Sequence, residues 1–390
     1  MDIKKLRSET PGTEHVTHFN NAGASLLPLK VYNVVLGYMK EELNYGGYET
    51  ARRHDRDLKK IYDSIADFIH AAPNEIAILE NATAAWNMVF FSIEFEKYDR
   101  ILTSVSEYAS NYISYLQLRR KVDISIEIIP NDEHGQTSVT ELKKMMDKRV
   151  KLVSITHIPT NSSLVNPVED IGKIVKQHEC LYLVDACQSV GQYPVDVNKI
   201  NCDMLSATGR KYLRGPRGTG FLYVRDKTLS KLDPPFLDLH AAEWIDSEHF
   251  EIRENNARRF ENWESNKANI LGLKTAVEYA ADIGIANIWK RVQKLAEKLR
   301  SQLAMIPEIT IHDIGKVKGG IVTFTVDTKS PVEIREKLYQ HHINVNTSSK
   351  SSTLIDMQQR ELDEVVRASV HYFNTEKEIK RMVTVLESII

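Results

Sequence analysis

A carboxylate and a lysine follow two neighbouring short strands in the middle of the sequence. Residues 181–184 form an apolar run, short enough for a strand buried on both faces, and the run ends on Asp185. A second short strand is expected over residues 203–207. It is followed by a hydroxyl group and two cations, on Thr208, Arg210 and Lys211. Glycine and proline residues at 215–218 then mark a turn, so the lysine is expected in a loop held between strands.

This set of groups matches the requirements of pyridoxal phosphate (PLP). A lysine can form a Schiff base with the cofactor, and an acid can keep the pyridine nitrogen protonated so that the ring accepts electrons. A hydroxyl group and a guanidinium group can hold the phosphate. The residue types leave one alternative open, in which Arg210 and Lys211 belong to a solvated basic turn and Asp185 caps the helix that follows.

The amino-acid sequence of this stretch resembles that of a known family. VDACQSVGQYPVDV followed by SATGRKYLRGPRGTGFLYV is similar to the class V aminotransferase and cysteine desulfurase family of fold type I PLP enzymes, and the resemblance extends over nearly the whole chain. It implies that Lys211 is the catalytic Schiff-base lysine, that Asp185 pairs with the pyridine nitrogen, and that Gln188 meets the phenolic oxygen of the cofactor. It also implies that Thr208 and Arg210 bind the phosphate. Desulfurases usually carry histidine at the position of Arg210, so the arginine is a departure that keeps the phosphate role.

Three further segments are implied to contact the cofactor. A helix is expected to start near Asn81, and the free N–H groups of its first turn suit an anion. The resemblance makes this turn the main phosphate site, through Ala82 and Thr83. Tyr108 stands where much of the family has histidine, and it is expected to stack on the ring. In the loop after residue 156, the resemblance favours Asn161 as the residue that contacts the ring, with Thr160 as the alternative.

Two segments are implied to bind an amino-acid substrate. FNNAGASLLP resembles the segment whose backbone amides lie near the substrate carboxylate, which assigns Ala22 and Gly23 to substrate binding. Near the C-terminus, VRASVHYFNTE assigns Arg367 as the clamp for the α-carboxylate, because a guanidinium group can bind a carboxylate at two points. A surface ion pair of Arg367 with Glu361 or Asp363 is the alternative.

The elements expected around these residues form an α/β protein. Strands alternate with helices over residues 16–225, which predicts a mostly parallel, doubly wound sheet with ligands at the carboxyl ends of its strands. We expect a large PLP-binding domain over residues 16–260. A smaller α+β domain is expected over residues 261–390, together with residues 1–15. The family resemblance also implies a homodimer, in which Ser265 replaces the family's phosphate-site threonine.

Composition excludes several other classes of protein. The 390 residues carry 51 Lys and Arg against 53 Asp and Glu, so no basic field favours nucleic acid as a partner. No apolar stretch approaches the roughly 20 residues that span a bilayer, and we expect a cytoplasmic protein without membrane contact. The 3 cysteines show no paired spacing for a metal, and none is expected.

The absence of a cysteine from one loop narrows the range of possible reactions. Desulfurases take sulfur on a cysteine in a loop of the small domain, and the matching loop, residues 346–353, contains none, so thiolate attack from this loop is excluded. What remains is β-elimination, transamination or racemisation. The motifs, with RRFENWES among them, look closest to the branch of C–S lyases of the hercynylcysteine sulfoxide lyase kind. We therefore expect a C–S β-lyase for a cysteine conjugate or sulfoxide; a class V aminotransferase, or a nucleotide-binding module without catalysis, are the alternatives.

Overall fold

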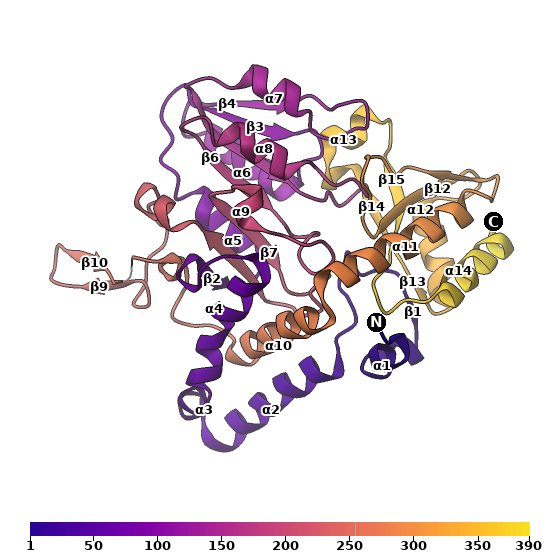
Figure 1. Ribbon diagram of the computed structural model, residues 1–390, viewed down its shortest axis with the longest axis horizontal. Helices are drawn as coiled ribbons and strands as arrows, with labels where there is room; N and C mark the ends of the chain where they lie inside the picture. The colour runs from indigo at the N-terminus through magenta and orange to yellow at the C-terminus, as the bar shows by residue number, and fades with distance from the viewer. Residues whose placement is uncertain (254) are drawn as a thin grey trace.

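A seven-stranded sheet forms the centre of the computed structural model, which describes residues 1–253 and 255–390 (Figure 1). Its strands lie in the order β2 (Ile76–Leu79), β8 (Gly220–Val224), β7 (Met204–Thr208), β6 (Leu181–Asp185), β5 (Val150–Thr156), β3 (Arg100–Ser104) and β4 (Ser125–Ile129). From β7 to β4 all neighbours are parallel, and β8 runs antiparallel to both β7 and β2. The sheet is therefore mostly parallel, as the alternating pattern predicted.

Apolar residues fill both faces of this sheet because helices cover both. Successive residues of a strand point to opposite faces: Leu183 packs in the core with Trp86 and Phe260, whereas Val184 packs in the core with Ile65 and other residues of the opposite layer. The surrounding helices are α4 (Asp55–Ile69), α5 (Ala82–Phe90), α6 (Ala109–Arg119), α7 (Val139–Met145), α8 (Val168–Val175), α9 (Val197–Ile200) and α10 (Lys267–Ile283). Burial on both sides explains why the strands read as continuous apolar runs.

A second, smaller sheet lies toward the C-terminal part of the chain. Its four strands are antiparallel, in the order β11 (Ile309–Ile311), β12 (Ile321–Val326), β15 (Glu364–Ser369) and β14 (Asn346–Ser349). The helices of this region are α11 (Ile285–Leu303), α12 (Pro331–Gln340), α13 (Leu354–Gln359) and α14 (Glu376–Ile389). A separate core joins them, with Val292 of α11, Phe324 of β12 and Leu386 of α14 among its members.

The N-terminal segment packs with the smaller sheet. Helix α1 (Ile3–Ser8) places Leu6 in the smaller core, which supports the proposal that residues 1–15 belong with the smaller domain. The alternation of strands and helices in the large sheet was expected to begin at residue 16, and this is wrong: β1 (Thr17–His18) pairs in parallel with β13 (Ile343–Asn344). Two residues are too short a pattern to distinguish one sheet from another.

Helix α10 bears on the proposed division into domains. It contacts α4 and α2 (Leu29–Tyr45), and its Leu273 and Val277 belong to the large core. The division at residue 260 stays a prediction, and we propose that the boundary lies nearer Gly284, where α10 ends.

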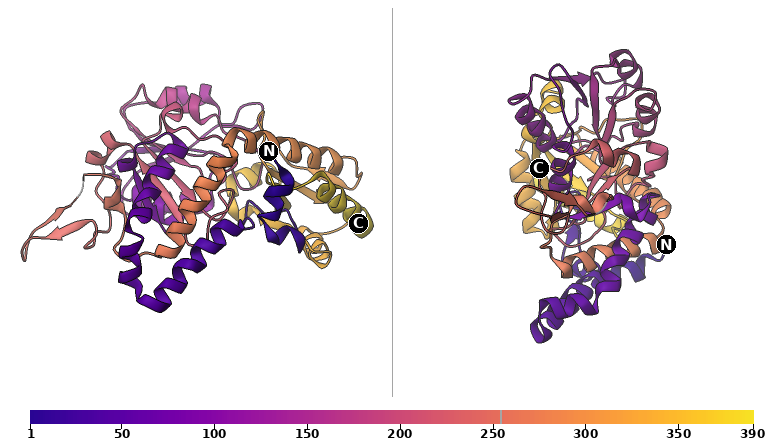
Figure 2. Two further views of the ribbon diagram at one scale, coloured as in Figure 1. Left: turned by 60° about the horizontal axis from the view of Figure 1, so that its bottom comes forward. Right: turned by 90° about the vertical axis from the view of Figure 1, so that its left-hand side faces the viewer.

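Two parts of the chain extend from the body of the protein. Helices α2 and α3 (Gly47–Arg53) form one, and the hairpin of β9 (Ala242–Trp244) and β10 (Phe250–Ile252) forms the other (Figures 1 and 2). Short 3-10 helices connect other elements: η1 (Pro11–Glu14), η2 (Pro73–Glu75), η3 (Asp226–Lys231), η4 (Ala257–Phe260) and η5 (Lys350–Ser352). Among the described residues, no helix has the length and apolar character needed to cross a membrane.

Candidate active site

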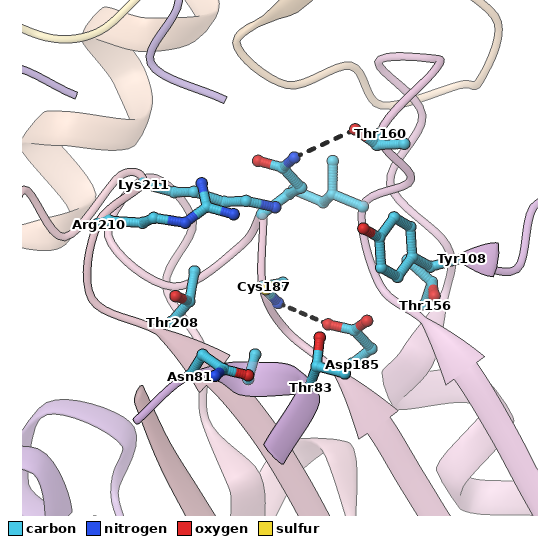
Figure 3. A pocket seen from close by; sticks show the side chains of 13 residues that line it. Asn81, Thr83, Tyr108, Thr156, Thr160, Asp185, Cys187, Thr208, Arg210 and Lys211 are labelled. Atoms are coloured by element: carbon cyan, nitrogen blue, oxygen red, sulfur yellow. Dashed lines mark hydrogen bonds between the residues drawn. The ribbon is translucent and has the colours of Figure 1, made fainter. Parts of the chain in front are cut away.

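The carboxyl ends of five strands of the large sheet surround a cavity, which we call the inner cavity (Figure 3). β2, β3, β5, β6 and β7 lead into the segments that line it. Eight predicted site residues lie in its wall: Ala82, Thr83, Tyr108, Asp185, Gln188, Thr208, Arg210 and Lys211. Lys211 and Asp185 thus share one cavity, which is the arrangement that a Schiff-base lysine and a pyridine partner require.

Asp185 is held rigidly at the end of β6. Its Oδ1 accepts a hydrogen bond from the backbone N–H of Cys187 at 2.9 Å, and its Oδ2 accepts one from Asn111 Nδ2 at 3.0 Å. Burial raises the pKa of the Asp185 carboxyl, while these hydrogen bonds and the Lys211 amine act against the rise. A cationic ring nitrogen in the cavity would therefore stabilise the carboxylate.

Lys211 lies in the loop after β7. Burial lowers the pKa of its amine, with the nearby Arg210 and Arg367 acting in the same direction. A lowered pKa increases the share of neutral amine, which is the nucleophilic form and the form that accepts a proton. The loop is anchored to the C-terminal part of the chain, because the backbone carbonyl of Tyr212 lies 2.8 Å from His371 Nε2.

The start of helix α5 forms an anion site in the wall of the inner cavity. Asn81 caps the helix, and its Oδ1 accepts the N–H of Ala84 at 2.8 Å. The N–H groups of Ala82 and Thr83 have no acceptor within the helix, as at every helix start, and lie at the positive end of its dipole. Gly220 of β8 lets this turn approach the sheet, because a Cβ there would lie 2.7 Å from the Asn81 carbonyl carbon.

Thr208 and Arg210 line the inner cavity together with this turn, but each also has a partner within the protein. The Thr208 hydroxyl donates to the Thr219 carbonyl at 3.3 Å, and Arg210 Nη1 donates to the Gly23 carbonyl. Arg210 still brings a guanidinium charge beside Lys211 (Figure 3). The predicted phosphate role of both residues stays a prediction that their position supports.

The cavity fits PLP by its donor set. It combines an amine, a carboxylate and a helix start with a buried polar atom that lacks a partner: Gln188 is 3% exposed, and its Oε1 has no hydrogen-bond partner. The amide Nε2 of Gln188 is held by the Ala22 carbonyl at 3.2 Å, so the side chain is fixed while its oxygen remains available. A buried polar atom without a partner is costly, which favours a bound group that completes the contact.

Between Asn161 and Thr160, the structure favours the second for a cofactor contact. Thr160 lines the inner cavity, and Asn161 does not. Asn161 instead joins the two sheets: its Nδ2 donates to the Ser349 carbonyl at 3.2 Å, and its Oδ1 accepts from the Ser348 hydroxyl. The preference for Asn161 stays a prediction, and we propose Thr160 as the residue that makes the expected contact. A motif match in an irregular loop can slip by one residue.

A second cavity, the outer cavity, adjoins the first and shares Tyr108, Thr160, Arg210 and Lys211 with it. Ala22, Gly23 and Arg367 line it, as do residues of β14. The amides expected to bind substrate are already engaged, since Ala22 N–H donates to the Ser369 hydroxyl at 2.9 Å and Gly23 N–H to the Asn20 carbonyl at 3.0 Å. The role of Ala22 and Gly23 in substrate binding stays a prediction, and a substrate would have to compete with these hydrogen bonds. The segment acts through its carbonyls, which hold Gln188 and Arg210.

Arg367 has the properties expected of a carboxylate clamp. It is 6% exposed, its Nη1 donates to the Thr160 hydroxyl, and its Nε is buried without a partner. Burial lowers its pKa to about 10. The alternative of a surface ion pair is wrong, because the side chain is buried and Asp363 lies 2.6 Å from Lys350 Nζ instead.

The sequence analysis missed two residues behind Asp185. Glu107 lies just before the N-cap of α6 and Asn111 lies in its first turn, and Asn111 Nδ2 contacts the carboxyl groups of both Glu107 and Asp185. An acid and an amide close together after a predicted strand were the available signal. Cys187 also lines the inner cavity, and burial raises its thiol pKa to about 11. Within residues 1–253 and 255–390, no group of three or more His, Cys, Asp and Glu side chains could hold a metal ion.

Comparisons with known proteins identify the family of the chain. The Aminotransferase class-V family matches residues 17–382. A probable cysteine desulfurase from Methanothermobacter thermautotrophicus is 30% identical over 396 residues, which cover 100% of this chain and 98% of the relative. The apo structure of a cysteine desulfurase from Thermococcus onnurineus NA1 has a TM-score of 0.93 and 26% identity, covering 100% of this chain and 98% of the other.

One further solved structure carries the cofactor. It is a mutant of C-DES with glycine covalently linked to PLP, with a TM-score of 0.88, 21% identity and coverage of 97% of this chain and 98% of the other. At that identity the likeness concerns the fold alone. The comparisons confirm the predicted family and the fold type I architecture, without distinguishing the C–S lyase branch. Because the family match spans all but the ends of the chain, the protein belongs to the Aminotransferase class-V family of PLP-dependent enzymes.

Proposed function

We propose that this enzyme is a C–S β-lyase that releases a sulfur-containing leaving group from a cysteine conjugate or cysteine sulfoxide. The observation that carries the proposal is the wall of the outer cavity, where a sulfur acceptor would be needed. Hydroxyl and amide side chains line it from the segment where the desulfurases of the family carry their cysteine: Asn346, Thr347, Ser348, Ser349 and Ser352. The one cysteine at the inner cavity, Cys187, is mostly protonated at neutral pH because burial raises its pKa to about 11. Elimination needs no thiolate acceptor.

Each group in the cavities has a distinct part in this chemistry. PLP supplies an electron sink for the negative charge that develops at the substrate α-carbon. Lys211 would hold the cofactor, and its neutral amine, once free, would take the α-proton of the substrate. Asp185 would pair with the ring nitrogen, and Arg367 would clamp the α-carboxylate so that the Cα–H bond is aligned for removal. The Cβ–S bond then breaks, and the electron pair leaves with the sulfur.

The outer cavity also bears on the leaving group. Its volume is about 470 Å³, against about 150 Å³ for the inner cavity, so the sulfur substituent has room there. The wall offers hydroxyl and amide groups, and its charged members are Arg210, Lys211, Arg217, Glu364 and Arg367. Leaving such groups without partners against an apolar substituent is unfavourable. A polar sulfur substituent, such as a sulfoxide or a carboxylate-bearing chain, is therefore the better match.

The proposal is tested by measuring product release in the absence of a 2-keto acid, the amino-group acceptor of a transaminase. Purified enzyme with PLP and a cysteine conjugate is expected to yield pyruvate, ammonia and a thiol, or a sulfenate from a sulfoxide, in equal amounts and with no 2-keto acid added. S-carboxymethylcysteine should give a kcat/KM about tenfold or more above S-benzylcysteine, which corresponds to about 1.4 kcal/mol in transition-state binding. Strict dependence on a 2-keto acid would contradict the lyase and establish transamination.

A homodimer is part of the proposal. Helix α2 exposes a stripe of large apolar side chains at alternating spacings of three and four residues, with exposed fractions from 41% to 84%: Leu29, Tyr32, Leu36, Met39 and Leu43. Such spacing marks one face of a helix, and a contiguous apolar face is a sign of an interface. A second copy of the chain is the occupant we propose, with Ser265 reaching the partner's phosphate site. Free cysteines at 180, 187 and 202 accord with a reducing, cytoplasmic location.

Charge on the stripe should separate the two copies. The double variant Leu36→Asp, Met39→Asp is expected to halve the mass measured by light scattering, since two carboxylates would be buried unpaired at the interface. Leu354→Asp, at an apolar residue of similar exposure (47%) on α13, is the matched control and should leave the mass unchanged. An unchanged mass for the double variant would place the interface elsewhere.

A further inference from the structure

Glu107 is a fully buried carboxyl group that the proposed reaction does not use. It is 3% exposed and receives five hydrogen bonds. Its Oε1 accepts from Tyr108 N–H at 2.9 Å, from Asn111 Nδ2 at 2.8 Å and from the Thr156 hydroxyl at 2.5 Å. Its Oε2 accepts from the Thr103 hydroxyl at 2.8 Å and the Tyr115 hydroxyl at 3.5 Å. A buried acid so completely surrounded by donors is built to hold negative charge.

Asn111 connects this acid to the candidate active site. Its Nδ2 carries two hydrogens, and the structure gives each an acceptor: Glu107 Oε1 at 2.8 Å and Asp185 Oδ2 at 3.0 Å. Because Glu107 is itself fixed by its other donors, the second N–H of Asn111 must point at Asp185. The orientation of the Asp185 carboxylate is thus set by Asn111, a residue that does not line either cavity.

We propose that Glu107 is a positioning residue for the cofactor's pyridine nitrogen: through Asn111 it fixes the Asp185 carboxylate, and it places a second negative charge behind it. The proposal rests on Asp185 as the partner of the ring nitrogen, but on no particular reaction. Its physical basis is that a negative charge in a medium of low polarity favours a nearby cation. The ring nitrogen would keep its proton to a higher pH than Asp185 alone would achieve.

Burial opposes the negative charge of both carboxyl groups in the protein without cofactor. Asp185 faces Lys211, Cys187 and the Asn111 amide, and Glu107 faces Asp185, Tyr115 and the two threonine hydroxyls. Burial raises the pKa of Glu107, and the hydrogen bonds from Thr156, Asn111 and Thr103 act against that rise, whereas Asp185 adds to it. Two carboxyl groups in one apolar layer are costly without a cation between or beside them. A protonated ring nitrogen supplies that cation.

Glu107→Gln separates charge from shape, since the amide keeps an oxygen for Asn111 but removes the negative charge. We expect the pH at which the bound cofactor's ring nitrogen loses its proton, followed by ¹⁵N NMR of cofactor labelled at that nitrogen, to fall by about one unit or more. With substrate, kcat should fall about tenfold while KM changes less than twofold, because the effect acts on the electron sink and not on substrate binding.

Tyr115→Phe is the matched control. It removes the longest contact to Glu107, leaves the charge, and should keep the wild-type ring titration. Should Glu107→Gln not fold, Thr103→Val serves instead: with one donor less, Glu107 holds its charge less well, and a smaller shift in the same direction is expected. A ring titration unchanged in the variant that folds would overturn the proposal. Because this measurement uses the enzyme and cofactor without substrate, it stands apart from the question of lyase or aminotransferase.

Discussion

Lys211→Ala is expected to lower kcat by about 10³-fold or more, with the residual protein still able to bind PLP without a covalent link. The variant loses both the amine that holds the cofactor and the base that takes the α-proton, and general base catalysis alone is worth about 10²–10⁴-fold. Borohydride reduction followed by mass analysis should find a pyridoxyl group on the Lys211 peptide of the wild type and on no peptide of the variant. A pyridoxyl group on another lysine would contradict the assignment.

A stability measurement separates this loss from misfolding. Burial lowers the pKa of the Lys211 amine, so between that lowered value and about 10.4 the unfolded chain binds more protons than the folded one, and the charge destabilises the apoprotein. Lys211→Met, which fills similar space without charge, should therefore be at least as stable as the wild-type apoprotein at neutral pH. The difference in free energy of unfolding should shrink as the pH rises toward 10.4. A less stable Lys211→Met apoprotein would mean that the amine has a structural partner.

The sequence predicts the large sheet well because its strands are buried on both faces. Apolar runs such as residues 181–184 can be recognised as strands without long-range information. The carboxyl ends of these strands then determine where Asp185 and Lys211 are expected to meet. The first strand was misplaced because β1 has two residues, and its partner, β13, lies more than 300 residues away. Pairing over that distance is decided by packing and leaves no local pattern.

The contacts of individual site residues could be predicted only where the residue type suits a single role in the site. Lys211, Asp185 and Arg367 each bring a charge into a buried place, and burial of a charge requires a reason. Thr160 and Asn161 are both polar and adjacent, so the chain's path through the loop decides which of them faces the cavity. The amides of Ala22 and Gly23 could not be assigned from sequence either, since every residue has an N–H and only the fold shows which are already paired.

Asp185→Asn is expected to lower kcat by about 10²–10³-fold, the usual effect of removing one well-placed electrostatic group. The amide keeps the size of the side chain but cannot hold the ring nitrogen protonated, so the electron sink is weakened at the step where charge develops. KM should change little, because Arg367, the clamp that we propose for the substrate carboxylate, lines the outer cavity, whereas Asp185 lines the inner one. A large rise in KM with kcat preserved would mean that Asp185 contacts the substrate instead of the ring.

Asp203→Asn is the matched control for this variant, and the comparison decides between chemistry and packing. Asp203 precedes β7 as Asp185 ends β6, and it also accepts a backbone N–H, from Tyr182 at 3.0 Å. Asp203 lies at the amino ends of the strands of the same sheet, opposite to the carboxyl ends that surround the inner cavity, and it lines neither cavity. If carboxylates at strand ends served only to satisfy backbone donors, the two variants would lose similar stability and similar activity. The position of Asp185 at the carboxyl edge predicts that only its variant loses the reaction, together with the pH-dependent absorbance of a protonated ring.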